Sequence, residues 1–176
     1  MDLNALMSTL LSQDSLQGMG QLTGASSDNV ASVLSSALPA LLSGAQGQAN
    51  DEDALAGFAG ALQDHAKDDT TDIASFLSGV DLEDGGKIVA HLLGGSQSQT
   101  TQDAADKAGL DLGKTASILS AVAPLLMSLL GQQTQQEEEK EEEKPAQSGS
   151  LLGGLFGNLL GNVDMGSVIL GLLGGK

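Results

Sequence analysis

The sequence has 176 residues, with 23 acidic and 7 basic side chains, a formal net charge of -16, and no Cys, Trp or Tyr. That length predicts one modest domain with a tail, and a core nearly free of aromatic residues favours close-packed helices over a β-sandwich. Because every base is Lys and the net charge is strongly negative, nucleic-acid binding is excluded, and the lack of cysteine excludes disulfides and thiolate sites.

Apolar residues recur at helical spacing in several short segments of the first 110 residues. The spacing predicts an opening helix over 3–11, a second that starts near Asp51 and runs to Leu62, and short helices over 73–77, 88–93 and 99–108. The pair Gly94-Gly95 ends the predicted helix over 88–93, and Gly109 ends the one over 99–108. No stretch alternates apolar and polar residues with β-branched side chains, so we expect an all-α protein without a sheet.

Two longer segments repeat each other at an offset of 85 residues. GASSDNVASVLSSALPALLS, which begins at Gly24, matches GLDLGKTASILSAVAPLLMS, which begins at Gly109. In both copies the apolar residues follow the i, i+3, i+4, i+7 spacing of an amphipathic helix. The sequence therefore predicts two related helical halves, over about 1–50 and 85–131, joined by helices in 51–84.

Proline and glycine positions predict where these two helices bend and end. Each copy carries a proline in mid-pattern, which predicts a kink or a restart near Leu38 in the first and Ala123 in the second. Ser27 or Asp28 can cap the first helix, and Gly44 and Gly131 are the expected ends of the first and second.

Composition divides the chain into a helical domain over 1–131, a charged low-complexity linker over 132–150 and a Leu/Gly-rich segment over 151–176. The linker contains EEEKEEEK and has no apolar residue larger than Ala, so it cannot bury enough surface to offset its ordering entropy. It can extend a helix in part, because Lys140 lies three or four positions from several Glu residues, although like charges also meet at that spacing.

The C-terminal segment places a glycine at every fourth position beside a stripe of Leu and Phe. As a helix it would present a glycine ridge, which lets backbones approach closely in a bundle or in lipid, although interior glycines disfavour the helix by about 1 kcal/mol each. The alternative is a disordered low-complexity tail. The expected association surface comprises Leu151, Leu152, Gly153, Leu155, Phe156, Gly157, Leu159, Leu160 and Gly161.

Two glycine patterns resemble nucleotide-binding loops without matching them. Gly109-x-x-x-Gly113-Lys114-Thr115 is one residue shorter than a phosphate loop and follows a helical pattern in place of a strand. A glycine stop followed by a new helix explains it better. Gly18-x-Gly20-x-x-x-Gly24 fails the dinucleotide fingerprint in spacing and in context.

We expect no metal, cofactor or catalytic residue. The two histidines, His65 and His91, have no cysteine and no His-x3-His partner, and His91 is better placed to meet free carbonyls at a helix end. The acidic turn from Asp81 has the wrong residues for a calcium loop, and no Gly-x-Ser-x-Gly elbow occurs. Paired carboxylates cannot be recognised among so many acids, so nothing in the sequence supports an enzyme.

Residues 85–133 combine a Gly-x-x-Ile-x-x-His-x-x-Gly turn with a helix that ends at Gly109 and a helix that carries Ala123-Pro124 before a Leu-rich run. This pattern resembles the YidB-like family of bacterial proteins, domain of unknown function 937, and residues 1–50 and the Gly/Leu-rich tail are similar to the rest of that family. The resemblance implies a multihelical fold and brings no activity, cofactor or catalytic residue. The Glu-rich run looks like an insertion in this sequence.

From these patterns we expect a non-enzymatic protein that self-associates or binds a protein partner through apolar helical surfaces and the tail. The alternative is a peripheral membrane or envelope-associated factor whose C-terminal segment inserts, and an enzyme of unrecognised type is the third option. The first base is Lys67, no secretory signal is recognisable, and no window offers about 18 consecutive strongly apolar residues, so we expect a cytoplasmic protein.

Overall fold

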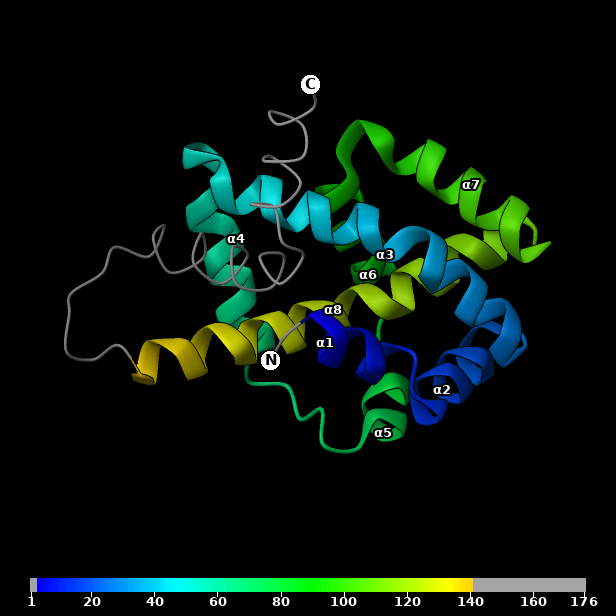
Figure 1. The fold of residues 1–176 in the computed structure, drawn as a ribbon, viewed down its shortest axis with the longest axis horizontal. Coiled ribbons are helices and arrows are strands. Elements are labelled where there is room, and N and C mark those ends of the chain that lie inside the picture. Colours follow the sequence, from blue (N-terminus) through cyan, green and yellow to red (C-terminus); the bar gives the residue numbers. More distant parts are fainter. Residues whose placement is uncertain (1–2, 141–176) are drawn as a thin grey trace, which may run out of the picture.

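The computed structural model describes residues 3–140, and the side chains of residues 4–136. All regular structure in this part of the chain is helical, which confirms the all-α, multihelical prediction (Figure 1). The helices are α1 (Leu3–Leu10), α2 (Gln13–Thr23), α3 (Ser27–Asn50), α4 (Glu52–His65), α5 (Ile73–Ser78), α6 (Leu82–Leu93), the single 3-10 turn η1 (Gly94–Ser96), α7 (Gln97–Ala108) and α8 (Leu112–Lys140).

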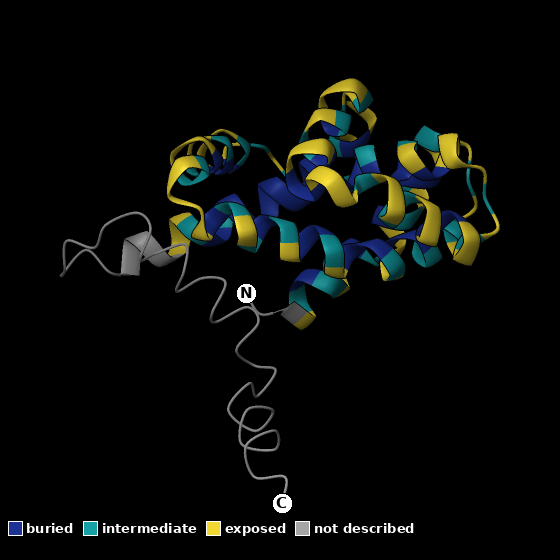
Figure 2. Cartoon of the chain, turned by 90° about the horizontal axis from the view of Figure 1, so that it is seen from above, coloured by how far each residue is buried: buried dark blue, intermediate teal, exposed yellow. Residues whose placement is uncertain are grey.

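Helix α8 is the centre of the fold. Every residue from Ala121 to Gly131 is buried, and α1, α2, α3, α4, α6 and α7 all pack against it. A helix that is apolar on all sides is stable only when neighbours cover all of it. Figure 2 shows the buried positions gathered on the inner sides of the helices and the exposed positions on the outer rim.

The repeat seen in the sequence is a repeat of helix pairs, α2–α3 and α7–α8. In each pair the first helix ends at a glycine with positive φ, Gly24 or Gly109, a cap follows two residues later, Ser26 or Asp111, and the second helix begins directly after the cap. Each cap oxygen accepts the backbone N–H three residues further on. The same short sequence therefore sets the same helix–turn–helix geometry twice.

Helix α2 was not predicted. Its sequence QDSLQGMGQLT contains two glycines and few apolar residues, so its periodicity is weak. Tertiary packing selects the helix, because Met19 and Ser15 are buried and Gly18 allows α5 to approach closely enough for the Leu77 side chain to fill the space above it.

The predicted helices over 3–11, 51–62, 73–77, 88–93 and 99–108 are all present, as α1, α4, α5, α6 and α7. Helix α6 begins six residues before the predicted segment, at Leu82, because the Asp81 carboxylate caps the backbone N–H groups of Glu83 and Asp84. Asp51 caps α4 in the same way, at the expected position.

Several predicted details of α3 and α8 were wrong. The cap of α3 is Ser26, not Ser27 or Asp28. Of the kink or restart predicted at each proline, the restart does not occur, since α3 runs through Pro39 and α8 through Pro124 without interruption. The remaining hydrogen bonds and the surrounding packing hold each helix together across the one missing donor.

Gly44 and Gly131 do not end their helices. A methyl group at Gly44 would overlap the backbone carbonyl of Leu92 in α6, and one at Gly131 would overlap that of Leu62 in α4. Gly85 of α6 stands in the same relation to the carbonyl of Ser120 in α8. These three glycines are therefore contact points at which helix backbones touch, a role that explains why they sit inside helices despite a cost of about 1 kcal/mol each.

Helix α8 continues to Lys140, past the predicted start of the linker at residue 132. Its continuation is anchored, since Gln133 is buried and the Gln132 side chain donates to the backbone carbonyl of Asp68 at 2.9 Å. The first part of the predicted linker is thus helical.

Two helices are long and apolar enough to cross a membrane, Ser27–Asn50 and Leu112–Gln136. For the second, 83% of the apolar window is buried inside the fold, as expected of the core helix of a globular domain, whereas only 44% of the first is buried. Every Val and Leu of α3 is nevertheless buried, so its large apolar side chains belong to the core, and the residues left open are small or polar.

Gly85→Ala should destabilise the fold by about 1–3 kcal/mol, because the added methyl group has no room against the Ser120 carbonyl and must push α6 away from α8. Urea unfolding followed by circular dichroism measures the change. Gly57→Ala in α4 is the matched control: its site is exposed, with no atom within 4 Å, so the same substitution should stabilise by about 0.5–1 kcal/mol. Equal effects at the two positions would contradict the proposed contact.

Candidate functional site

The outward side of α3 is free of charge over its whole length beyond the first turn. No Asp, Glu, Lys or Arg occurs between Asn29 and Asn50, in a chain of net charge -16. The fully exposed positions in its middle repeat every four residues and so form one stripe, which we call the α3 face: Ser35, Pro39, Ser43 and Gly47.

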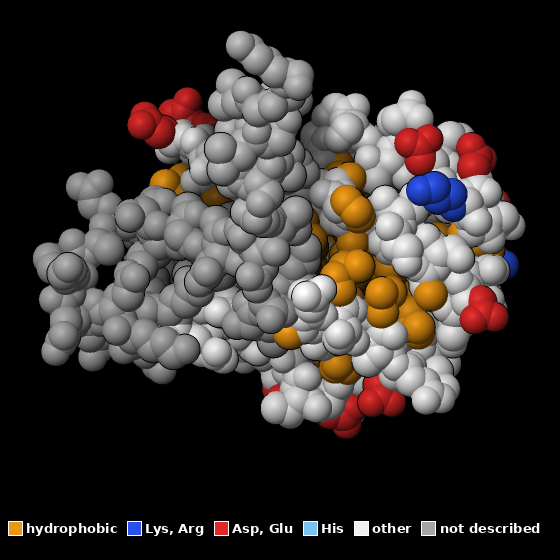
Figure 3. All heavy atoms as spheres, in the orientation of Figure 1, with side chains coloured by type: hydrophobic (Ala, Val, Ile, Leu, Met, Phe, Trp, Pro, Cys, Tyr) orange, Lys and Arg blue, Asp and Glu red, His pale blue; other side chains and the backbone are white. Residues whose placement is uncertain are grey.

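Hydrophobic side chains gather near the centre of the molecular side on which α3 lies, and acidic and basic ones stand around the edge (Figure 3). Half-buried apolar residues also pack against the core from α1, α2 and α3, among them Met7, Leu16 and Ala40. An uncharged centre with a charged rim is the composition of a protein–protein interface.

A shallow groove follows the line where α7 packs against α3. Two adjoining hollows of about 400 and 430 Å³ share Ser36 and Lys107 in their walls. The α7 wall of the first is charged, with Asp103 and Asp106, and the second is lined mainly by serines of α3, Ser35 among them. The groove thus marks the charged border of the α3 face.

A polar cluster fastens the 66–72 segment to α8. The Ser128 hydroxyl, fully buried, donates to the Asp68 carboxylate at 2.9 Å, and the His65 Nδ1 lies 3.0 Å from the same Oδ2 oxygen. One turn further along α8, Gln132 binds the Asp68 carbonyl and the Thr70 hydroxyl. The cluster joins residues about 60 positions apart in the chain.

Ser128, His65 and Asp68 are the residue types of a hydrolase triad, but their order differs. In a triad the histidine lies between the nucleophile and the acid, so that it can accept the hydroxyl proton. Here the carboxylate lies between the other two, and Ser128 donates to it and is also 2.9 Å from the Pro124 carbonyl of its own helix. In this arrangement the carboxylate, and not the histidine, accepts the Ser128 proton, and the three side chains hold a chain segment in place.

Two further carboxylates shape the same segment. Hydrogen bonds from the side chain and backbone of Thr71 lower the pKa of Asp69. For Asp72, the backbone N–H of Ser75 and then its hydroxyl lower the pKa, because Asp72 caps α5. Because both carboxyl pKa values are lowered, the Thr71–Asp69 hydrogen bonds and the Asp72 cap are complete at neutral pH and are lost only in acid, as the pH falls through the folded-state pKa values.

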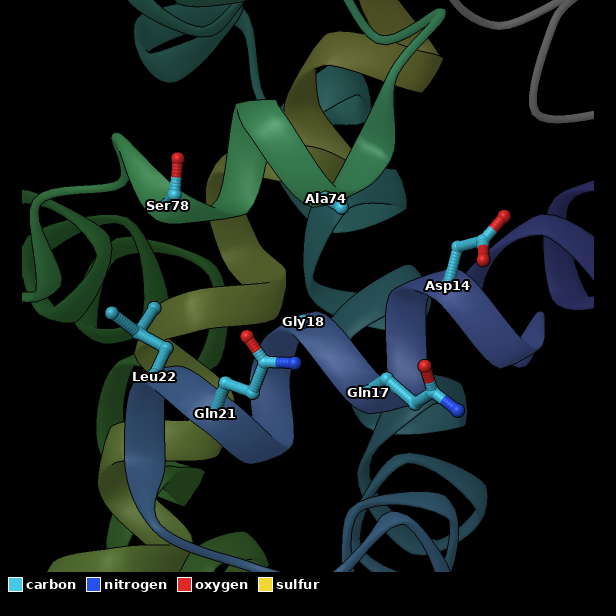
Figure 4. A pocket seen from close by; sticks show the side chains of 7 residues that line it. All are labelled: Asp14, Gln17, Gly18, Gln21, Leu22, Ala74 and Ser78. Atoms are coloured by element: carbon cyan, nitrogen blue, oxygen red, sulfur yellow. The ribbon is translucent and has the colours of Figure 1, made fainter.

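A separate pocket of about 300 Å³ lies between α2 and α5 (Figure 4). Asp14, Gln17 and Gln21 line it along α2, and Ala74 and Ser78 line it from α5, with Gly18 at its floor. Its polar groups are one carboxylate, two amides and one hydroxyl. In the part of the chain that the structure describes, no group of three or more His, Cys, Asp or Glu side chains is arranged to hold a metal ion.

The residues singled out in the sequence are dispersed. The predicted association surface, Leu151 to Gly161, lies outside the described residues. Gly109 ends α7 in the left-handed conformation and Asp111 caps α8, so the motif that resembled a phosphate loop is a helix junction. Asp81 caps α6, and His91 lies in the last turn of that helix, as predicted.

Sequence reasoning missed both the α3 face and the polar cluster. The face was detectable, because a run of 22 residues without charge is unusual in so acidic a chain and only one side of an amphipathic helix needs to be apolar. The cluster was not, since Asp68 and Ser128 carry no motif and only the fold brings them together.

A family model described as bacterial protein of unknown function (DUF937) matches residues 5–133. No curated protein matches the chain, and no solved structure does. The matched range begins in α1 and ends at Gln133 in α8, so it contains both helix pairs, the polar cluster and the α3 face.

Ser128→Ala should lower the free energy of unfolding by about 1–3 kcal/mol, because it removes a buried donor to the Asp68 carboxylate. Protease cleavage in the 66–72 segment should also become faster, because that segment loses one of its ties to α8. Ser117→Ala is the matched control in the same helix: the Ser117 hydroxyl donates to the Gly113 carbonyl in an exposed bond, and its loss should change stability by less than about 0.5 kcal/mol. A stability change at Ser128 no larger than that of the control would contradict the role of the cluster.

Proposed function

This chain belongs to the DUF937 family of bacterial proteins of unknown function, and we propose that it is a non-enzymatic interaction protein that associates with a second copy of itself. The uncharged α3 face is the observation that carries the proposal. It is a surface that core packing does not require to be free of charge, because its residues point outward.

The charge of the protein makes this face conspicuous. Sixteen excess negative charges keep copies apart in solution, and that repulsion is weakest where a surface lacks acids. Two copies can therefore approach through the α3 face without bringing carboxylates together, whereas the acidic first turns of α4 and α6 would meet like charge. Electrostatic repulsion between two copies thus favours an encounter in which their α3 faces meet.

The face is small, so the association it supports alone is weak. The stripe from Ser35 to Gly47 covers 13 residues, or about 20 Å of helix, and one helix stripe of that length offers less surface than the roughly 800 Å² per partner of a standard interface. The Leu/Gly-rich segment over 151–176 offers additional apolar surface, as expected from the sequence, and a tethered second contact strengthens association without new chemistry.

Membrane binding is the competing function. The length and mean hydropathy of α3, which are sufficient for a membrane span, are the observation that favours it. Against it, the serines of the α3 face and the net charge of -16 suit a protein surface better than an anionic lipid surface. The proposal accordingly places the protein in the cytoplasm.

Ser43→Lys should weaken self-association of the full chain at least tenfold, because it buries an unpaired charge at the centre of the contact. Sedimentation velocity over a concentration series measures the dissociation constant. Gln63→Lys, which adds the same charge at an exposed position of α4, should shift it by less than twofold. A wild-type chain that stays monomeric throughout the series, or that loses association equally in both variants, would refute the proposal.

Flotation of the full chain with liposomes tests the competing function in the same variants. Flotation of the wild type that Ser43→Lys abolishes would show that the α3 face meets lipid, and the protein–protein proposal would then be wrong. No flotation, together with concentration-dependent oligomers, supports it.

A further inference from the structure

The repeat of helix pairs provides an internal comparison for the α3 face. At the offset of 85 residues, Ser35, Pro39 and Ser43 of α3 correspond to Ser120, Pro124 and Ser128 of α8. The α8 stripe is covered by the rest of the fold, with Pro124 and Ser128 buried, whereas the α3 stripe is exposed. The same residue pattern is thus buried on α8 and exposed to solvent on α3.

What covers the α8 stripe shows what such a face accepts. Pro124 has no N–H, so the Ser120 carbonyl lacks its usual helical donor, and this carbonyl is where the backbone of α6 makes its closest approach, at Gly85. Gly86 follows, with its ideal Cβ position 3.4 Å from the Ser120 hydroxyl. On α8, a small stripe interrupted by proline is thus the seat of a helix that presents glycine.

The equivalent carbonyl on α3 is that of Ser35, which Pro39 deprives of its donor in the same way. Ser35 and Pro39 are exposed, and Ser35 lines the groove beside α7. Among the described residues, 3–140, no helix presents a glycine to this carbonyl, whereas the carbonyl of Ser120 has Gly85.

The remainder of the chain contains a segment of the required kind. Residues 151–163 lie outside the described part and carry Gly153, Gly157 and Gly161, with Leu and Phe between them and no charge. In helical conformation these glycines would form one ridge with the same four-residue spacing as the α3 face, and the segment and the face are both 13 residues long, or about 20 Å. The glycine ridge of residues 151–163 therefore matches the α3 face in residue spacing and in length.

Charge distinguishes this segment from the rest of the C-terminal region. The run EEEKEEEK over 137–144 would meet Asp103 and Asp106 at the border of the face, whereas residues 151–163 bring no charge to it. The ten residues 141–150 can span at most about 33–36 Å, which is long enough to let the segment leave its own domain and reach a neighbour.

We propose that the α3 face of one copy binds residues 151–163 of a second copy, with the glycine ridge seated against the Ser35 carbonyl and Pro39. Reciprocal exchange of the two segments then closes a two-fold dimer and buries both faces. This inference rests on the proposed function, since it names the contact through which the copies associate.

The absence of native cysteine allows a selective cross-linking test. Two single variants of the full chain are prepared, Ser43→Cys on the α3 face and Asn158→Cys beside the glycine ridge, and are mixed in equal amounts under mild oxidation. Because each molecule carries one thiol, a disulfide between positions 43 and 158 can form only between copies. We expect this mixed dimer, identified by mass spectrometry of the linked peptides, to exceed either symmetric dimer at least fivefold.

Gln63→Cys mixed with Asn158→Cys is the matched control and should give cross-links only at the rate of random collision. As an independent readout, Gly157→Leu should weaken sedimentation-measured dimerisation at least tenfold by filling the ridge, without changing the unfolding midpoint of the domain.

The outcomes separate this inference from the proposed function. A predominant disulfide between two copies of Ser43→Cys means that two α3 faces pair with each other, which overturns the exchanged segment and keeps self-association. A third variant carries both Ser43→Cys and Asn158→Cys. If it forms an intramolecular disulfide and the mixture of single variants gives no mixed dimer, the segment binds its own domain, and the exchanged segment is again overturned. Random cross-linking of a chain that remains monomeric in sedimentation refutes both proposals.

Discussion

The fold depends on direct contact between helix backbones at glycine. Gly44, Gly85 and Gly131 each leave room for a carbonyl oxygen of another helix, and together they fix α6 between α3 and α8 and α4 against α8. A core without Trp or Tyr has few large side chains to fill the space between helices, so stability has to come from short interhelical distances and many small aliphatic contacts.

Proline serves the same close packing. Inside α8, Pro124 leaves the Ser120 carbonyl without its helical donor, and the fold brings α6 to that point. Helix α3 carries the same proline at the equivalent position, but there it faces outward. One helix sequence thus has two environments, and the difference between them is what identifies the outward copy as a surface left for another helix.

Charge has an organising role that burial alone does not describe. Carboxylates cap α4, α5, α6 and α8, and Asp68 joins the 66–72 segment to the core helix. Acids also occupy the first turns of α2, α3, α4 and α6, where the helix dipole favours them. The middle of α3, far from any helix end, is left free of charge, so the same distribution that starts the helices also defines the uncharged face.

The sequence by itself determined the helical class, the repeat, most helix positions and the family, because periodicity, caps and glycine stops are local properties of the chain. It could not determine that Gly44 and Gly131 are packing contacts, since a helix end and a close approach select the same residue. Helix α2 and the Asp68–Ser128 pair were likewise decided by tertiary structure, as both depend on partners distant in the chain. The sequence also could not determine which of the two matching helices is buried. Six helices pack around α8 and leave one side of α3 exposed, and this difference depends on how all the helices pack together.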